Sequence, residues 1–212
     1  VVAIVAGAAE FGVLFLAAAL FWSLFEQAGS TLNLFADRDT RTSVFGWSFP
    51  STYFQSLNSA FIWIFAPVMA WLWLALGSRQ PSTIVKFALG EILVAAGFGV
   101  LVLASILASA GVQVSPMWLT VTYLLHTFGE LCLSPVGLSA MTKLAPARIA
   151  GLMMGVWFLA SSVGNFIAGR LAGFYESMPL PQLFGVVAVF GIGAGVVLLA
   201  LARPISRLTG SK

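Results

Sequence analysis

Six long apolar runs, each long enough for a membrane-crossing helix, limit most strongly what this chain can fold into. A span needs about 20 mostly apolar residues to cross roughly 30 Å of hydrocarbon. Because lipid cannot hydrogen-bond to backbone N–H and C=O groups, such segments form helices, which pair these groups internally. The sequence therefore predicts an all-α, polytopic membrane protein in which residues 1–212 form one six-helix bundle. The predicted spans are 13–35, 53–76, 83–108, 117–143, 149–175 and 182–202.

Charged residues are too scarce to cover a water-facing surface. They make up 8% of the chain, whereas soluble domains carry about 25%. The net charge of +3 does not indicate a nucleic-acid partner, because the basic residues are dispersed over the connections between the runs. We therefore expect the lipid bilayer to be the main partner of the surface.

The basic residues divide unequally between the two ends of the predicted spans. Three lie at one end, near acidic residues: Arg38, Arg41 and Arg170. Seven lie at the other end: Arg79, Lys86, Lys143, Arg148, Arg203, Arg207 and Lys212. The positive-inside rule assigns the richer end to the cytoplasm. We expect a multi-pass protein of the cell membrane, with both termini of this segment cytoplasmic.

Ionisable residues inside the apolar runs are the leading candidates for function. Glu26 lies within the first predicted span, and Glu130 lies near the middle of the fourth. A charge at the centre of a span costs about 2.5–3.5 kcal/mol, so burial without a cationic partner favours the neutral acid. Such an acid can carry a proton or hold an ammonium group. The alternative is a neutral carboxyl that hydrogen-bonds another helix as part of the packing.

Polar residues recur at steps of three and four, which places them on one face of a helix. Four spans carry such a stripe: Ser23, Glu26, Ser30, Asn33 and Asp37 in the first, Gln55, Asn58 and Ser59 in the second, Thr122, His126, Glu130, Ser134, Gly137 and Met141 in the fourth, and Trp157, Ser161, Asn165 and Ala168 in the fifth. We expect these faces to converge on a wet central cavity. Glu91, early in the third span, is expected to be a partly solvated ion beside Lys86.

Glycine pairs one turn apart predict close helix packing. They are Gly151 with Gly155, Gly169 with Gly173, and Gly191 with Gly195. A single cysteine, Cys132, excludes an internal disulfide and a cysteine-rich metal site. The chain begins VVAIVAGAAEFG, without Met, and is expected to be a piece of something longer.

Four segments resemble helices seven, eight, ten and eleven of the proton-dependent oligopeptide transporters, the POT or PTR family of the major facilitator superfamily. They are FWSLFEQAGSTLNLFA, FQSLNSAFIWIFAPVMAWLW, GELCLSPVGLSAMTKLAP and GLMMGVWFLASSVGNFIAG. The resemblance runs from about Phe21 to Gly173, with the motifs in the family's order. It implies that the six helices are helices 7–12, one half of a proton-coupled symporter that imports di- and tripeptides by alternating access.

The resemblance also implies roles for individual residues. Glu130 matches the glutamate that receives the peptide's ammonium group, and Asn58 matches an asparagine that hydrogen-bonds the same end of the peptide. Trp157 and Ser161 match residues that line a side-chain pocket. Glu26 matches a glutamate implicated in proton coupling. Protons are then the coupling ion, with no cofactor and no metal.

The family's first-helix Glu-x-x-Glu-Arg motif does not occur in this sequence. The basic groups that would bind the peptide carboxylate belong, by the same resemblance, to an N-terminal six-helix half. We expect that missing half to be a partner, and we expect this half alone not to transport.

Two other classes of membrane protein remain open at this point. A six-span intramembrane hydrolase would need Ser134 and His126 to act together, but they lie eight residues apart on one helix and no Gly-x-Ser-x-Gly turn occurs. An oligomeric channel is the second alternative. The sequence favours a transporter and not an enzyme.

Overall fold

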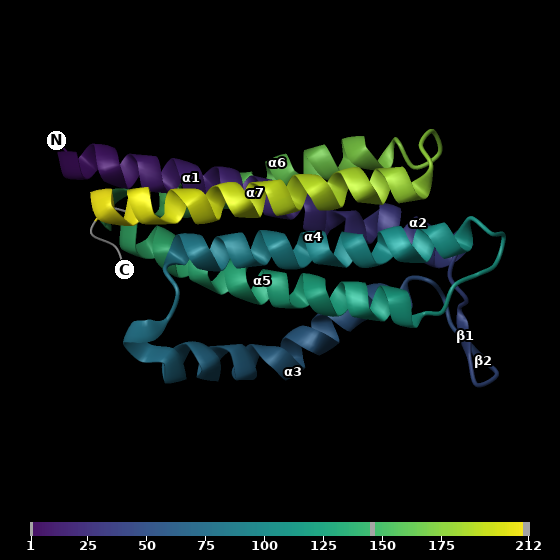
Figure 1. The fold of residues 1–212 in the computed structure, drawn as a ribbon. Coiled ribbons are helices and arrows are strands. Elements are labelled where there is room, and N and C mark those ends of the chain that lie inside the picture. Colours follow the sequence, from purple (N-terminus) through teal and green to yellow (C-terminus); the bar gives the residue numbers. More distant parts are fainter. Residues whose placement is uncertain (1, 145–146, 210–212) are drawn as a thin grey trace.

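The computed structural model describes the backbone of residues 2–144 and 147–209, and within these ranges it contains six long helical segments that lie side by side (Figure 1). Their order is α1 (Val2–Phe25), the 3-10 turn η1 (Glu26–Gly29), α2 (Thr31–Arg38), β1 (Ser43–Val44), β2 (Trp47–Ser48), α3 (Tyr53–Leu76), η2 (Gly77–Arg79), α4 (Thr83–Ala108), α5 (Met117–Leu144), η3 (Ala147–Ile149), α6 (Ala150–Ala172) and α7 (Leu180–Thr209). The predicted all-α class is confirmed.

Five helical segments of the described chain are long and apolar enough to cross a membrane. One combines α1 with α2, and the others are α3, α4, α6 and α7. The sixth, α5, has 28 residues but is not among them, because its apolar run is interrupted by polar residues such as Thr122, His126 and Glu130. Among the six long helical segments, the least apolar is therefore the one that carries the central acid.

The two chain ends and the α3–α4 connection lie at the same end of the bundle (Figure 1). That connection contains η2 (Gly77–Arg79), whereas α2 (Thr31–Arg38) and the β1–β2 hairpin lie at the opposite end. The two connections therefore lie at opposite ends of the bundle, as the predicted spans imply. The side chains of Lys143, Arg207 and Lys212, which the topology prediction also uses, lie outside the described part.

The first predicted helix is not continuous, contrary to our expectation for 13–35. The α-helix ends at Phe25, a 3-10 turn follows, and Ser30 leaves helical geometry with φ −128° and ψ −92° before α2 begins. The side chain of buried Gln27 bonds locally, donating to the Ser23 carbonyl at 3.3 Å and accepting from the Thr31 hydroxyl at 2.9 Å. The break divides the predicted polar stripe. Ser23 lies before the break and is buried, whereas Glu26 lies in the 3-10 turn and is half-buried.

A short hairpin that the sequence analysis does not predict joins α2 to α3. Strands β1 and β2 pair antiparallel, with Val44 opposite Trp47. Phe45 and Gly46 between them both have positive φ, 51° and 83°, the geometry of a two-residue hairpin turn that matches strand twist.

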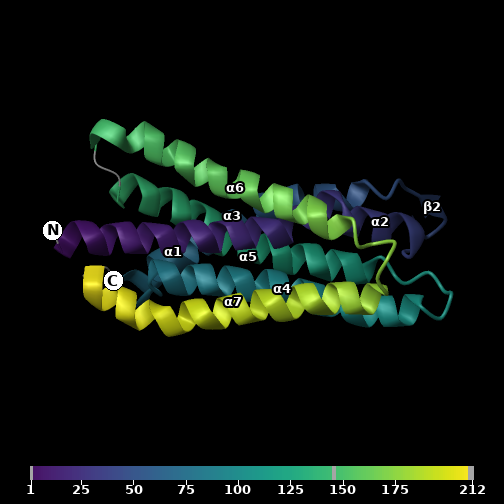
Figure 2. The ribbon, with the colours of Figure 1, turned by 90° about the horizontal axis from the view of Figure 1, so that it is seen from above.

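Helix α4 packs between α5 and α7, and α1 packs against α6 and α7 (Figures 1 and 2). Helix α3 is the outlying helix. It packs mainly against α5, and only Phe54 and Met69 on it are buried. The core is therefore built from α1, α2, α4, α5, α6 and α7, while α3 lies outside it, beside α5.

The predicted glycine pairs differ in how closely they approach another helix. Gly191 and Gly195 of α7 do face α4 closely, because a Cβ at Gly195 would lie 2.5 Å from Ile92 and one at Gly191 would lie 2.8 Å from Ala95. The expectation is wrong for Gly151, Gly155 and Gly169, where an added Cβ would meet nothing within 4 Å in the described chain. Two glycines one turn apart share a face, but the sequence does not say what that face meets.

Polar contacts tie the end of α2 to the connection between α6 and α7. Arg38 forms an ion pair with Glu176, and the Tyr175 hydroxyl donates to Asp39 at 3.1 Å. Burial, together with the nearby Asp39 carboxylate, raises the pKa of Tyr175 above its usual value. These contacts hold the end of the bundle opposite the chain termini.

Candidate functional site

Glu130 of α5 is held by a polar side chain from α3. The Asn58 amide donates to Glu130 Oε2 at 3.0 Å and to the Thr127 hydroxyl at 3.1 Å. Thr127 in turn donates to the Tyr123 carbonyl at 2.8 Å. A neutral amide donor satisfies one carboxylate oxygen but supplies no charge, so the acid keeps its capacity to bind a cation.

Glu26 approaches the same place from the break in the first helix. Its carboxyl lies within electrostatic range of Glu130. It is the first residue of η1, where the first helix is interrupted. Both acids therefore lie in the same part of the bundle.

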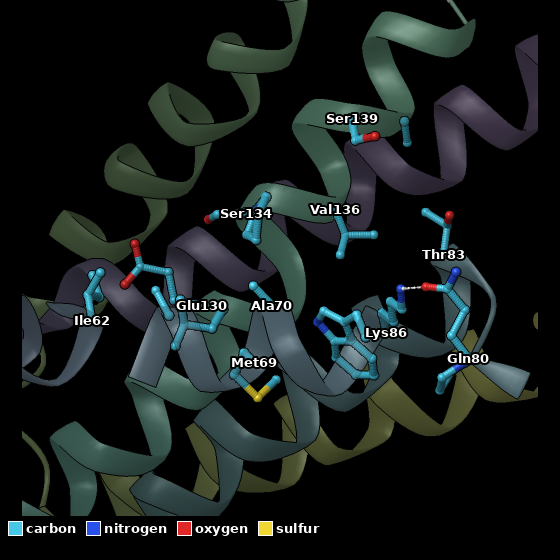
Figure 3. Close-up of a pocket in the computed structure, with 16 residues that line it drawn as sticks. Ile62, Met69, Ala70, Gln80, Thr83, Lys86, Glu130, Ser134, Val136 and Ser139 are labelled. Atoms are coloured by element: carbon cyan, nitrogen blue, oxygen red, sulfur yellow. Dashed lines mark hydrogen bonds between the residues drawn. The ribbon is translucent and has the colours of Figure 1, made fainter. Parts of the chain in front are cut away.

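A pocket of about 670 Å³ lies between α3 and α5, and Figure 3 shows Glu130 on one side of it and Lys86 on the other. Its polar lining residues are Gln80, Thr83, Lys86, Glu130, Ser134 and Ser139, with apolar walls from Ile62, Ala66, Met69, Trp73 and Leu131. The space has the size of small-molecule sites in proteins. It offers an anionic group, a cationic group and an apolar wall to one ligand.

The residues that the sequence analysis selects are not all brought together. Glu130 lines the pocket, Asn58 binds Glu130, and Glu26 lies near it. Trp157 and Ser161 are not among the lining residues. Trp157 is buried on α6, where its ring packs against Phe87 at 6.0 Å between centroids and leaves no room for a Cβ at Gly137. Ser161 is half-buried, one turn further along α6.

His126 does not join Glu130 in the pocket. Its ring is buried between α4 and α5, packed so closely that a Cβ at Gly97 would lie 2.6 Å from it. Neither ring nitrogen makes a well-formed hydrogen bond within the described chain, although the backbone of Val94 lies near. His126 is therefore not hydrogen-bonded to Ser134, and the pairing that an intramembrane hydrolase needs is absent.

Glu91 is also misjudged by the sequence analysis. It is fully buried in α4, and neither carboxyl oxygen has a hydrogen-bond partner in the described part of the chain. We expected a partly solvated ion because Glu91 lies near Lys86 and close to the start of the helix. The structure differs because the side of α4 that carries Glu91 faces the interior of the bundle.

Sequence reasoning missed the contribution of Thr127 and of the α3–α4 connection. Thr127 lies three residues before Glu130, so helical spacing provided a signal for it. Gln80 lies in the α3–α4 connection and Thr83 begins α4, and both line the pocket without belonging to a motif. No sequence signal identifies them.

A bundle of apolar helices with a broken first helix and an acid at a pocket between helices is the architecture of a membrane transporter half. Family comparison agrees, because the pattern of the POT family (PTR2) matches residues 5–187. The chain belongs to the POT family. Relatives in this family are peptide transporters and not enzymes.

Curated relatives match nearly the whole chain. The peptide transporter YePEPT of Yersinia enterocolitica is 46% identical over 203 residues, which cover 92% of this chain and 40% of that protein. A di-/tripeptide transporter of Lactococcus lactis subsp. cremoris is 36% identical, with 93% of this chain and 40% of the relative covered. The chain thus spans about 40% of the length of the relatives that it matches.

Solved structures give the same relation in space. A peptide transporter POT mutant in complex with alafosfalin superposes with a TM-score of 0.86 at 42% identity, covering 93% of this chain and 41% of that one. A POT family transporter in complex with 5-aminolevulinic acid gives a TM-score of 0.88 at 33% identity, with 95% and 42% covered. The helical arrangement is that of one half of these proteins.

Proposed function

We propose that this chain is the C-terminal six-helix half of a proton-coupled symporter that imports di- and tripeptides by alternating access. The observation that carries the proposal is the Glu130 carboxylate, bonded by a neutral donor from α3 and exposed to a pocket. Relatives of this chain are peptide transporters, and every peptide with a free N-terminus carries the ammonium group that Glu130 lacks. An N-terminal half supplies the rest of the substrate site and the contact for α3.

Each of the predicted residues has a part in this proposal. Glu130 binds the peptide's ammonium group, and Asn58 orients the carboxylate from α3. Glu26 carries the coupled proton, and its nearness to Glu130 links protonation to occupancy of the site. Ser161 of α6 lines a side-chain pocket that forms against the N-terminal half, and Trp157, which is buried against Phe87, supports that pocket from within this half. The two halves then rock about the site to open inward.

The coupling ion is the proton, and no cofactor takes part. The protein resides in the cell membrane, with the end that carries both chain termini and the α3–α4 connection in the cytoplasm. The sequence supports this orientation, because seven basic residues belong to the connections and tail at that end and three to the other.

Uptake of a labelled dipeptide by the full-length transporter in liposomes tests the proposal. We expect accumulation that depends on an inward proton gradient, and we expect the Glu26→Gln variant to lose this dependence because glutamine cannot release a proton. Exchange of labelled for unlabelled peptide, which needs no net proton movement, should persist in that variant.

The matched control for Glu26→Gln is Asp37→Asn, because Asp37 is an exposed acid of the same region, bonded to Ser51. It should keep gradient-driven uptake. If wild-type accumulation does not depend on an imposed proton gradient, transport is not proton-coupled. If Glu26→Gln still shows gradient-driven uptake, Glu26 is not the residue that carries the coupled proton.

The Asn58→Ala variant tests the support that α3 gives to the acid. It removes the donor to Glu130 Oε2 and to Thr127, so we expect peptide affinity to fall about tenfold, the value of one hydrogen bond to a charged group. Competition binding measures this, with Ser59→Ala, on the exposed neighbouring residue, as control. An unchanged affinity in Asn58→Ala would contradict a role for the α3 contact.

A further inference from the structure

The β1–β2 hairpin carries apolar and polar side chains on opposite faces. Val44 stands opposite Trp47, and Ser43 stands opposite Ser48. Because neighbouring residues of a strand point to opposite faces, the first pair forms an apolar face and the second a polar one. Val44 and Trp47 are both exposed within the described chain. A hairpin with this division of its faces fits a boundary between water and an apolar phase.

Phe45, at the turn of the hairpin, is fully exposed and sits in a strained backbone conformation. Its φ of 51° is a value that bulky side chains rarely adopt. A two-residue turn of this kind favours Asn before Gly, and here Gly46 follows Phe45. Neither turn chemistry nor packing within the described chain accounts for a phenylalanine at this position. Such strain is typically retained where a residue has a function, and for an apolar ring that function is a contact outside this chain.

A series of aromatic rings connects the hairpin to the core. The Trp47 ring packs against Phe49 with 5.3 Å between centroids, and Phe49 packs against Phe54 at 5.6 Å. Phe54 is buried in the core. The base of the hairpin is closed by the Phe49 N–H, which donates to the Thr42 carbonyl at 3.0 Å. The apolar face is therefore held in a fixed position relative to the bundle.

The hairpin lies where the chain leaves the membrane-crossing segments. One such segment ends at Arg38 and the next begins at Tyr53, and the hairpin between them projects from the end of the bundle opposite the chain termini (Figure 1). Trp and Tyr are enriched at this level of a bilayer, and Tyr53 is itself exposed. Arg41, near the base, is exposed and forms no ion pair within the described chain. Its guanidinium is suited to a lipid phosphate.

We propose that the hairpin is a lipid-binding anchor. Phe45 and Trp47 insert among the phospholipid headgroups of the leaflet at this end, the serine face stays in water, and Arg41 meets a phosphate. The anchor holds the start of α3 at a fixed depth, because the Trp47 ring also contacts Tyr53, with 6.2 Å between centroids. This inference goes beyond the proposed function and depends neither on the substrate nor on the coupling ion.

Fluorescence quenching of the full-length transporter in liposomes tests the inference. The chain contains seven tryptophans, so the signal of Trp47 is taken as the difference between wild type and Trp47→Phe, which keeps an aromatic ring. The quenchers are phosphatidylcholine brominated near the headgroup, phosphatidylcholine brominated near the bilayer centre, and aqueous iodide. We expect the headgroup-proximal bromines to quench Trp47 most strongly and iodide to quench it least, since the ring lies among lipid.

Phe45→Asn is the second variant, because asparagine suits the turn while the apolar tip is lost. It should reduce the quenching of Trp47 by brominated lipid and increase the quenching by iodide. Ser48→Asn, on the polar face of the same hairpin, is the matched control and should leave both unchanged.

Three results would overturn the inference. Quenching of wild-type Trp47 mainly by iodide would place the hairpin in water. Protection from all three quenchers would show that another part of the protein covers it. Quenching in Phe45→Asn equal to that in wild type would show that the tip makes no contribution to lipid binding.

Discussion

Peptide uptake by the Glu130→Gln variant should fall about 100-fold below wild type. Glutamine has nearly the same size and can still accept a hydrogen bond from Asn58, so the packing between α3 and α5 is retained. What is lost is the negative charge that neutralises the peptide's ammonium group. Removing one partner of a buried, hydrogen-bonded charge pair costs about 2–5 kcal/mol, and about 2.8 kcal/mol corresponds to a factor of 100.

The measurement is initial uptake of labelled dialanine by the full-length transporter in liposomes, with N-acetylated dialanine as a second ligand. Wild type should discriminate strongly against the acetylated form, and Glu130→Gln should bind both forms equally poorly. The control variant is Glu91→Gln, which neutralises another acid within the membrane-spanning helices that has no partner in the described chain and lies outside the pocket. Undiminished uptake by Glu130→Gln would refute the role of this residue.

The second large effect concerns stability. The Gly164→Ala variant should be destabilised by about 3 kcal/mol, the upper end of what overpacking usually costs. A Cβ at Gly164 of α6 would lie 2.5 Å from the Cβ of Trp22, 2.9 Å from the Ala19 carbonyl oxygen and 2.9 Å from the Ser23 nitrogen, all in α1. Two of these atoms are backbone, so a change of rotamer cannot relieve the contact, and α1 and α6 must separate.

Thermal unfolding of the purified full-length protein in detergent measures this effect. Gly169→Ala is the matched control, because it lies on the same helix and an added Cβ there would meet nothing within 4 Å. It should be neutral or slightly stabilising, since alanine favours a helix by roughly 1 kcal/mol over glycine. Equal melting temperatures for the two variants would show that α1 and α6 do not pack as described.

The candidate site divides into parts that differ in how well the sequence predicts them. Glu130 and Glu26 are recognisable because an acid inside an apolar run is costly wherever the helix lies. The sequence places Asn58 on a polar strip, but its role required the family resemblance, and its bond to Glu130 joins residues 72 positions apart. His126 and Glu91 are misjudged because helical spacing gives the face of a residue but not the neighbour of that face. Lys86 is recognisable as a pocket residue only from the structure, because the pocket that it lines lies between α3 and α5.

The sequence by itself determines the class of this protein and its membrane-spanning helices. Each helix satisfies its own backbone hydrogen bonds, so a long apolar run forms one in lipid whatever its neighbours are. Only the tertiary structure decides which acid reaches a pocket, which glycine meets another backbone and where the first helix breaks. These outcomes depend on contacts between helices far apart in the chain, and such contacts are set by packing among all the helices together, not by any one segment.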